Sequence, residues 1–216
     1  MKVPLTPWRR HVEAWKGCDR CPIHLTRTNV CLGRGALPCD ALFVGEAPGP
    51  SEDVVGQPFV GPAGHLLDQV IERATVATQT PGTIGMGHNS LNWAFTNLVG
   101  CFLLDEDGDK EEPPDESIEA CKPRLREFAE LCDVPKGKLR LVVAVGSLAF
   151  DWLKPGYKHS IKLHRPLSLV PQAPEFGTIH LIQVTHPAAV LRAPMAMRSL
   201  MVQRMAVTLR NALEEL

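Results

Sequence analysis

The stretch 41-ALFVGEAPGP-50 joins a short apolar run to a turn that is rich in Gly and Pro. This pattern predicts a buried strand over 41–46, followed by a loop. Working outward, other apolar runs predict further strands, and segments with helical spacing between them predict helices. The expected strands cover 41–46, 93–99, 139–146 and 179–185, and the expected helices cover 4–16, 63–74, 116–131, 147–153 and 196–215.

The expected strands and helices alternate, which is typical of a parallel sheet covered by helices. The third strand, LRLVVAVG at 139–146, is nearly all apolar, as a strand buried on both faces must be. Ser147 is the expected N-cap of the helix that follows. We therefore expect a three-layer α/β/α fold with a central, mainly parallel four-stranded sheet. No linker is evident, so residues 1–216 are expected to form a single domain with an N-terminal arm.

The bulk composition suits one domain with an ordinary core, since 44% of the 216 residues are hydrophobic and 22% are charged. The apolar runs are short and end at Gly, Pro or charged residues, and the first 18 residues contain no apolar signal-peptide core. We therefore expect a monomer in the cytoplasm, with no membrane partner.

The net charge of −1 hides an uneven distribution. Residues 1–121 contain 17 acidic and 9 basic side chains, whereas residues 122–216 contain 7 acidic and 14 basic ones. A basic half can supply a phosphate-binding face while the whole chain stays neutral. Two differently solvated surfaces explain the same pattern, and charge alone favours that explanation.

Three segments that contain Gly, Pro or His follow predicted strands: GEAPG (45–49), TNLVGC (96–101) and HPAAVLR (186–192). Ligands of parallel α/β sheets bind beyond the carboxyl ends of the strands. The sequence therefore predicts an active site where these segments meet.

Seven cysteines indicate a possible metal site. Cys18 and Cys21 form a C-x2-C pair, close enough for both sulfurs to reach one metal. Cys101 and Cys121 lie far along the chain, at the boundaries of predicted elements. Spacing alone leaves zinc, an iron–sulfur cluster and a redox pair open. The remaining cysteines are expected to be small buried side chains: Cys31, Cys39 and Cys132.

The string 45-GEAPGPSEDVVGQPFVGPAGHLLD-68 adds an ordered pattern after the first strand. Together with the upstream C-x2-C, TN-x-V-x-C, AC-x-P-x-L, VAVG and HPAAVLR, it resembles the iron–sulfur uracil-DNA glycosylases of the thermophile type, called family 4. The resemblance covers about residues 15–210 in the same order. It implies a monofunctional DNA-repair hydrolase that cleaves the N-glycosidic bond of uracil in DNA and leaves an abasic site.

The resemblance also implies roles for individual residues. A structural [4Fe–4S] cluster would be held by Cys18, Cys21, Cys101 and Cys121. Phe59 would stack on the uracil ring, and Asn97 would bind its N3–H and O4 edge. His186 would donate to O2 of the departing base, and Glu46 would orient water or stabilise the sugar cation. The remaining substrate and DNA contacts would come from Gly45, Ala47, Arg192 and Arg165.

Each of these side chains also has a purely structural explanation. Phe59 could be a core residue, Asn97 could form a strand-end Asx turn, and His186 could be a buried histidine with satisfied hydrogen bonds. Ala47 stands where the classical uracil glycosylases have an aspartate, as the resemblance to family 4 implies.

The chain departs from the family around the third cysteine. Gly100 replaces a basic residue, Phe102-Leu103-Leu104 replaces Arg-Pro-Pro, and an acidic segment follows at 104–116. Two alternative functions therefore stay open. One is a DNA-binding or partner-binding protein that lost turnover, and the other is a glycosylase for a different deaminated base.

Overall fold

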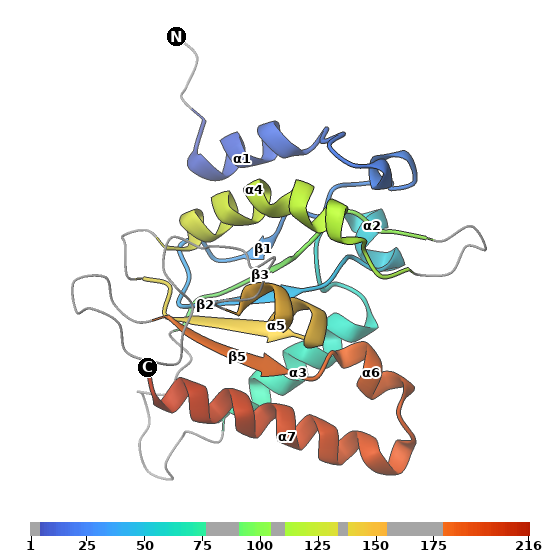
Figure 1. Cartoon of the computed structure of the whole chain (residues 1–216). Helices are drawn as coiled ribbons and strands as arrows, with labels where there is room; N and C mark the ends of the chain where they lie inside the picture. Colours follow the sequence, from blue (N-terminus) through green and yellow to red (C-terminus); the bar gives the residue numbers. More distant parts are fainter. Residues whose placement is uncertain (1–4, 77–90, 105–110, 134–137, 155–178) are drawn as a thin grey trace.

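The computed structural model describes residues 5–76, 91–104, 111–133, 138–154 and 179–216 (Figure 1). It confirms the predicted fold class, because helices cover both faces of a mainly parallel sheet. The strands are β1 (Arg34–Gly35), β2 (Ala41–Gly45), β3 (Trp93–Asn97), β4 (Leu141–Val145) and β5 (His180–Val184). They lie side by side in the order β1-β3-β2-β4-β5.

Among the described residues the sheet has five strands, whereas the sequence predicts four. The four predicted strands are present and pair in parallel, and the additional strand β1 pairs with β3 in the antiparallel sense. β1 has only two residues, Arg34 and Gly35, so it carries no apolar alternation from which a strand could be predicted.

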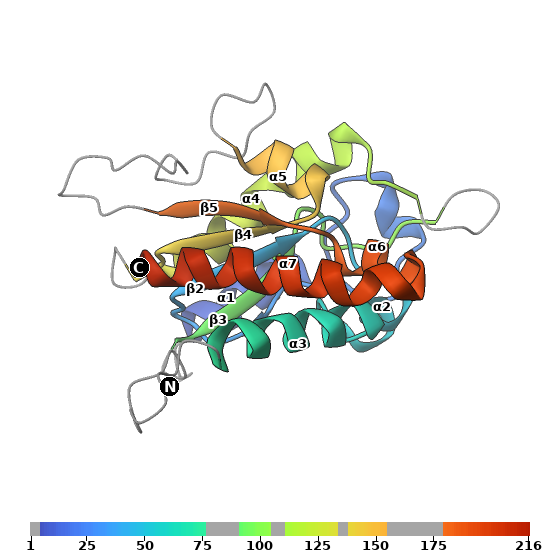
Figure 2. The same cartoon turned by 90° about the horizontal axis from the view of Figure 1, so that it is seen from below.

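The helices form one layer on each face of the sheet. One face carries α1 (Pro7–Trp15), α4 (Asp115–Cys132) and α5 (Ser147–Leu153), and the other carries α3 (Pro62–Val76) and α7 (Met195–Glu214). Figure 2 shows α3 and α7 running side by side across the sheet. The alternation along β2 serves both layers, since Leu42 and Val44 pack with the α4 side and Phe43 packs with the α3–α7 side.

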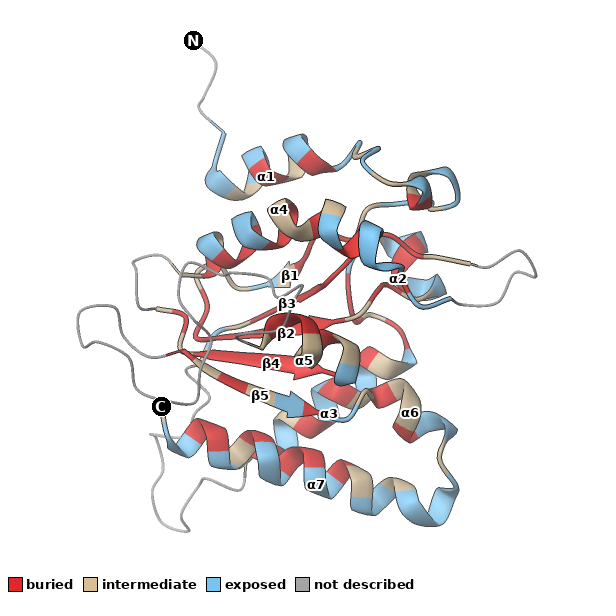
Figure 3. Cartoon of the chain, in the orientation of Figure 1, coloured by how far each residue is buried: buried red, intermediate tan, exposed pale blue. Residues whose placement is uncertain are grey.

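The central strands are the most deeply buried part of the molecule. Every residue of β2 and β4 is buried, as expected for strands covered on both faces (Figure 3). The predicted apolar stripe of α7 is also buried: Val202, Met205, Leu209 and Leu213.

Several local details differ from the sequence predictions. Two six-residue helices, α2 (Pro50–Val55) and α6 (Pro187–Arg192), lie in segments that the sequence predicts as loops. Both begin at a proline, a residue that fits the first turn of a helix. Ser147 is the first residue of α5 and not its cap, because the N-cap position belongs to Gly146.

The N-terminal arm is fastened at both of its ends. α1 packs on α4, where His11 Nδ1 and Trp15 Nε1 lie 3.1 and 2.6 Å from the same Glu127 carboxylate oxygen. After the short 3-10 helix η1 (Pro22–Leu25), the backbone amides of Thr28 and Asn29 donate to the Asp53 carboxylate at 2.9–3.2 Å. No helix in the described part of the chain is long and apolar enough to span a bilayer.

Candidate active site

The carboxyl ends of β2, β3, β4 and β5 share one edge of the sheet because these strands are parallel. In Figure 1, the arrows of β4 and β5 point toward the side where α2 and α6 lie. Gly45 is the pairing partner of Asn97, and Gly146 N donates to Val184 O at 2.9 Å. The three segments singled out in the sequence therefore lie along this edge, as expected.

Gly45, Phe59 and Asn97 come together at the end of β2. A Cβ atom added to Gly45 would lie 2.6 Å from Cζ of Phe59 and would overlap Oδ1 of Asn97. Only a glycine at this position allows the aromatic ring and the amide to approach the same point. Phe59 and Asn97 are 6% and 3% exposed, so both are held by their surroundings.

The backbone at Phe59 adopts an unusual conformation, with a φ of 56°. Gly64 makes room for it, because a Cβ there would collide with the Phe59 carbonyl group. Arg34 supports the same turn by donating from Nε to Pro58 O at 2.9 Å and from Nη2 to Phe59 O at 3.1 Å. Its guanidinium also lies over the Phe95 ring, 3.9 Å from the centroid.

The burial of Phe59 agrees with both explanations given for it. Its side chain belongs to the apolar cluster between the sheet and α3–α7, so core packing is one of its functions. Its ring also borders Gly45 beside the Asn97 amide, where a planar ligand would be recognised. A single side chain therefore links the core to the edge of the strands.

Glu52 ties the two halves of the glycine-rich loop together. Its carboxylate accepts from Gly49 N at 3.1 Å and from Gly61 N at 2.8 Å, and the residue is 8% exposed. Neither Glu52 nor Arg34 was recognised as a site residue from the sequence. For Glu52 a signal exists, since a glutamate three residues after the start of a helix is typical of a capping box.

His186 is the N-cap residue of α6, and its ring is oriented by the backbone. Nδ1 accepts from Ala188 N at 3.2 Å, so the neutral imidazole has its proton on Nε2. The side chain also borders Gly146, where an added Cβ would lie 3.3 Å from Cβ of His186. The end of β4 thus contacts the residue that follows β5.

The other expected contact residues occupy different environments. Glu46 is half-buried directly after β2, and its carbonyl accepts from Val99 N at 3.1 Å. Ala47 is buried, and Arg192 is exposed at the end of α6. Arg165 lies outside the described residues.

The four cysteines named as cluster ligands are called the cysteine corner below; the thiols of Cys21 and Cys121 lie near that of Cys101. Cys18 and Cys21 are half-buried, whereas Cys101 and Cys121 are buried. Burial raises the pKa of the Cys101 thiol to about 11; the guanidinium of Arg27 opposes this rise, and the nearby Cys121 and Cys21 thiols add to it. Arg27 Nη1 lies 3.7 Å from Cys101 Sγ.

The donors of this cysteine corner do not converge on one point. Within the described residues, no three His, Cys, Asp or Glu side chains are close enough to bind a single metal ion. The remaining cysteines are fully buried as predicted: Cys31, Cys39 and Cys132. Cys31 donates to Glu52 O at 3.1 Å, and burial raises the pKa of its thiol to about 12.

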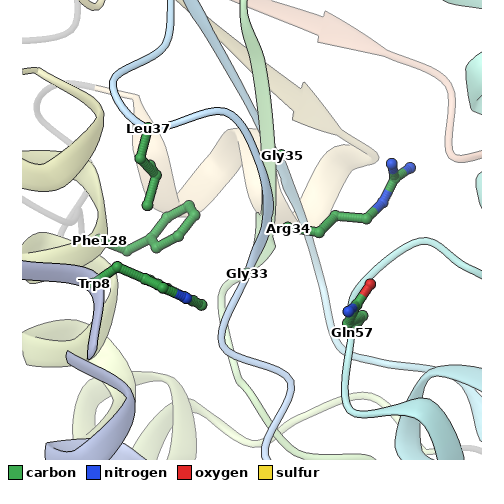
Figure 4. A pocket seen from close by; sticks show the side chains of 7 residues that line it. All are labelled: Trp8, Gly33, Arg34, Gly35, Leu37, Gln57 and Phe128. Atoms are coloured by element: carbon green, nitrogen blue, oxygen red, sulfur yellow. The ribbon is translucent and has the colours of Figure 1, made fainter. Parts of the chain in front are cut away.

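A separate pocket of about 440 Å³ lies at the β1 edge of the sheet (Figure 4). Trp8, Leu37 and Phe128 lie on one side of the Gly33–Gly35 segment, and Arg34 and Gln57 lie on the other. None of the site residues expected from the sequence lines this pocket. Arg34 lines this pocket and also donates to Phe59 O, so it links the pocket to the turn near the strand ends.

Comparisons with known proteins identify the family. A family model described as the uracil DNA glycosylase superfamily matches residues 32–210. A type-4 uracil-DNA glycosylase of Pyrobaculum aerophilum is 33% identical over 184 residues, which cover 84% of this chain and 83% of the relative. A type-4 uracil-DNA glycosylase of Thermotoga maritima is 31% identical over 182 residues, which cover 83% and 81%. The chain therefore belongs to the uracil-DNA glycosylase superfamily and, within it, to the type-4 uracil-DNA glycosylases.

Proposed function

We propose that this protein is a monofunctional DNA-repair glycosylase that hydrolyses the N-glycosidic bond of uracil in DNA and leaves an abasic site. The observation that carries the proposal is the convergence of Phe59 and the Asn97 amide on the bare α-carbon of Gly45. This arrangement offers one aromatic face and one donor–acceptor pair, which are the two groups needed to hold a small planar base.

The substrate base must leave the duplex before it reaches these residues, at a cost of a few kcal/mol. In the proposed complex, Phe59 stacks on the uracil ring. The Asn97 side chain donates to O4 and accepts from N3–H, because an amide carries both functions. Cytosine presents the opposite pattern on this edge, so Asn97 is the proposed source of base selectivity.

Departure of uracil places negative charge on the base and positive charge on the sugar. We assign the first charge to His186, whose Nε2–H would donate to uracil O2. The hydrogen bond from Ala188 N to Nδ1 supports this role, since it favours the tautomer with its proton on Nε2. A donor that is already oriented loses little energy to reorganisation during the reaction.

Glu46 is proposed to act at the sugar. A carboxylate at this strand end would orient the attacking water at C1′ and stabilise the oxocarbenium-like sugar. Its position directly after Gly45 supports the assignment, because it lies in the same loop as the base-binding group. Gly45 and Ala47 would supply backbone contacts around the substrate.

The proposed partner is uracil-containing DNA, bound by a monomer in the cytoplasm. Arg192 would contact the DNA backbone or the gap left by the flipped base, because it is exposed at the end of the helix that His186 begins. Arg165 is a second candidate for a phosphate contact.

We also propose that Cys18, Cys21, Cys101 and Cys121 hold a [4Fe–4S] cluster. The donor set fits, since all four are thiols and Arg27 provides a cation beside Cys101 that would stabilise thiolate charge. A [4Fe–4S] cluster would need four thiolates, and these cysteines would supply them. When bound, the cluster would cross-link the arm, the Cys101 turn and α4.

The test is incubation of the purified protein with oligonucleotides that contain one uracil opposite G, opposite A or in a single strand. Release of free uracil and an alkali-labile site are expected. Release no greater than that of the Glu46→Gln/His186→Ala double variant would contradict the proposal. Tight binding without release would favour the non-enzymatic alternative, and release confined to another deaminated base would favour the second alternative.

A further inference from the structure

Arg124 is among the largest fully buried side chains of the protein, with 1% of its surface exposed. It lies on α4, three residues after Cys121, and its guanidinium reaches from the helix to the end of β3. No role was assigned to it above.

The guanidinium donates to four oxygen atoms. Nη1 donates to Leu32 O at 3.1 Å and to Thr96 Oγ1 at 3.0 Å. Nη2 donates to Asn97 O and, at 3.2 Å, to Leu98 O. Two of these acceptors belong to Asn97 and its neighbour, so Arg124 fixes the backbone from which the Asn97 amide projects.

Arg124 is an unusual choice for this position. Among the described residues, none of its hydrogen-bond acceptors is a carboxylate, and a buried charge without an ionic partner is costly. Lysine could not reproduce the planar fork that reaches four acceptors. This cost in stability indicates that the position of the strand end, which the guanidinium holds, matters more than stability alone.

The same guanidinium lies close to the backbone of position 100. A Cβ added to Gly100 would lie 3.3 Å from Arg124 Nε and 3.1 Å from Cγ1 of Val30. Gly100 immediately precedes Cys101, so Arg124 lies between two cysteine-bearing segments and the base-recognition residue.

We propose that Arg124 is a positioning residue for Asn97, which holds the end of β3 so that the amide meets the base beside Phe59. The inference rests on the proposed uracil excision. Through Arg124, α4 would support the base-recognition residue directly, and the same helix carries Cys121.

The test is a double-mutant cycle between Arg124→Lys and Asn97→Ala, with Arg126→Lys on the exposed face of α4 as the matched control. Single-turnover excision, inhibition by free uracil, iron content and thermal unfolding are measured for each variant. Arg124→Lys is expected to slow excision and weaken uracil inhibition by roughly 10- to 100-fold, the size of one or two lost charged hydrogen bonds. Arg126→Lys is expected to behave as wild type.

The cycle separates positioning from general stability. If Arg124 acts through Asn97, adding Arg124→Lys to Asn97→Ala slows excision by less than about twofold. Fully additive effects, or an activity loss that tracks lost iron, would overturn the inference while leaving the proposed function intact. A wild-type protein that releases no uracil would overturn both.

A milder variant keeps the test decisive if Arg124→Lys does not fold. Thr96→Val keeps the shape of the side chain and removes one acceptor of Nη1. It is expected to show the same non-additivity with Asn97→Ala, and full additivity would again overturn the inference.

Discussion

The proposed base-binding end of the sheet and the cysteine corner are built in different ways. Gly45, Phe59 and Asn97 are held in place by strand register, buried packing and hydrogen bonds within the protein. Cys18 and Cys21 are half-buried and lie within the arm, between α1 and the short η1 helix. Packing and hydrogen bonds thus hold the proposed base-binding residues, whereas in our proposal the cysteine corner is held together by the cluster.

The largest expected effect comes from a variant that removes a proposed catalytic group and leaves the base-binding end and the cysteine corner in place. His186→Ala should lower the single-turnover rate of uracil excision by about 10²- to 10³-fold, because it removes the proposed donor to the departing base. Iron content and the thermal midpoint should stay near the wild-type values, since His186 is only half-buried and lies at the N-cap of the six-residue helix α6. Single-turnover uracil release measures the effect, with the exposed His65→Ala as control. A change of less than tenfold would remove His186 from the mechanism.

A second variant fills the space beside Gly45, where Phe59 and Asn97 meet. Gly45→Ala places a methyl group against Phe59 and Asn97, so excision should fall by about 10- to 100-fold and unfolding should become easier by roughly 1–3 kcal/mol. Uracil release and chemical denaturation measure the two effects. Gly17→Ala is the matched control, because nothing lies within 4 Å of an added Cβ there. Equal behaviour of the two variants would show that the pocket is not preformed.

The third prediction concerns a variant that disrupts the cysteine corner and leaves the proposed base-binding residues in place. Cys101→Ser should abolish iron binding, lower the thermal midpoint by several degrees and open residues 16–33 to proteolysis, because the arm loses its cross-link. The sheet should remain folded. Cys31→Ser preserves the hydrogen bond to Glu52 O and should retain iron. Iron retained by Cys101→Ser, or stoichiometric zinc in a colourless wild-type protein, would contradict the ligand assignment.

The smallest expected effect concerns the attachment of α1. Burial lowers the pKa of His11, although its hydrogen bond with Glu127 partly opposes this shift. The folded state therefore binds fewer protons than the unfolded state just below the ordinary pKa of about 6.5. Stability should fall as the pH drops through that value and level off below the folded pKa. Between pH 7.5 and 5, the thermal midpoint of His11→Gln should fall less steeply with decreasing pH than that of the wild type. Equal slopes would show that His11 is not the source of this pH dependence.

Periodicity was sufficient for most of the fold. The apolar runs predicted β2 to β5, because strands buried on both faces have little freedom in composition. It failed for β1, α2 and α6, which are too short to show a period. Their positions depend on contacts with the rest of the chain.

Candidate site residues that lie in sequence motifs could be predicted, whereas the residues that support them from distant parts of the chain could not. Gly45, Asn97 and His186 follow strands, so their common edge could be expected from the parallel order. Arg34 and Arg124 lie far from the motifs they support and became visible only through hydrogen bonds to carbonyl groups. Such acceptors belong to the backbone, so they leave no pattern in the sequence.

The most direct test of the account is the quantity of free base released under single-turnover conditions from matched strands that contain uracil, cytosine or thymine at one position. We predict one equivalent of uracil and no cytosine, because the Asn97 amide matches the N3–H and O4 edge of uracil and not the corresponding edge of cytosine. Thymine shares this edge with uracil, so its release measures whether the site also excludes a 5-methyl group. No release of uracil, or comparable release of cytosine, would contradict the account.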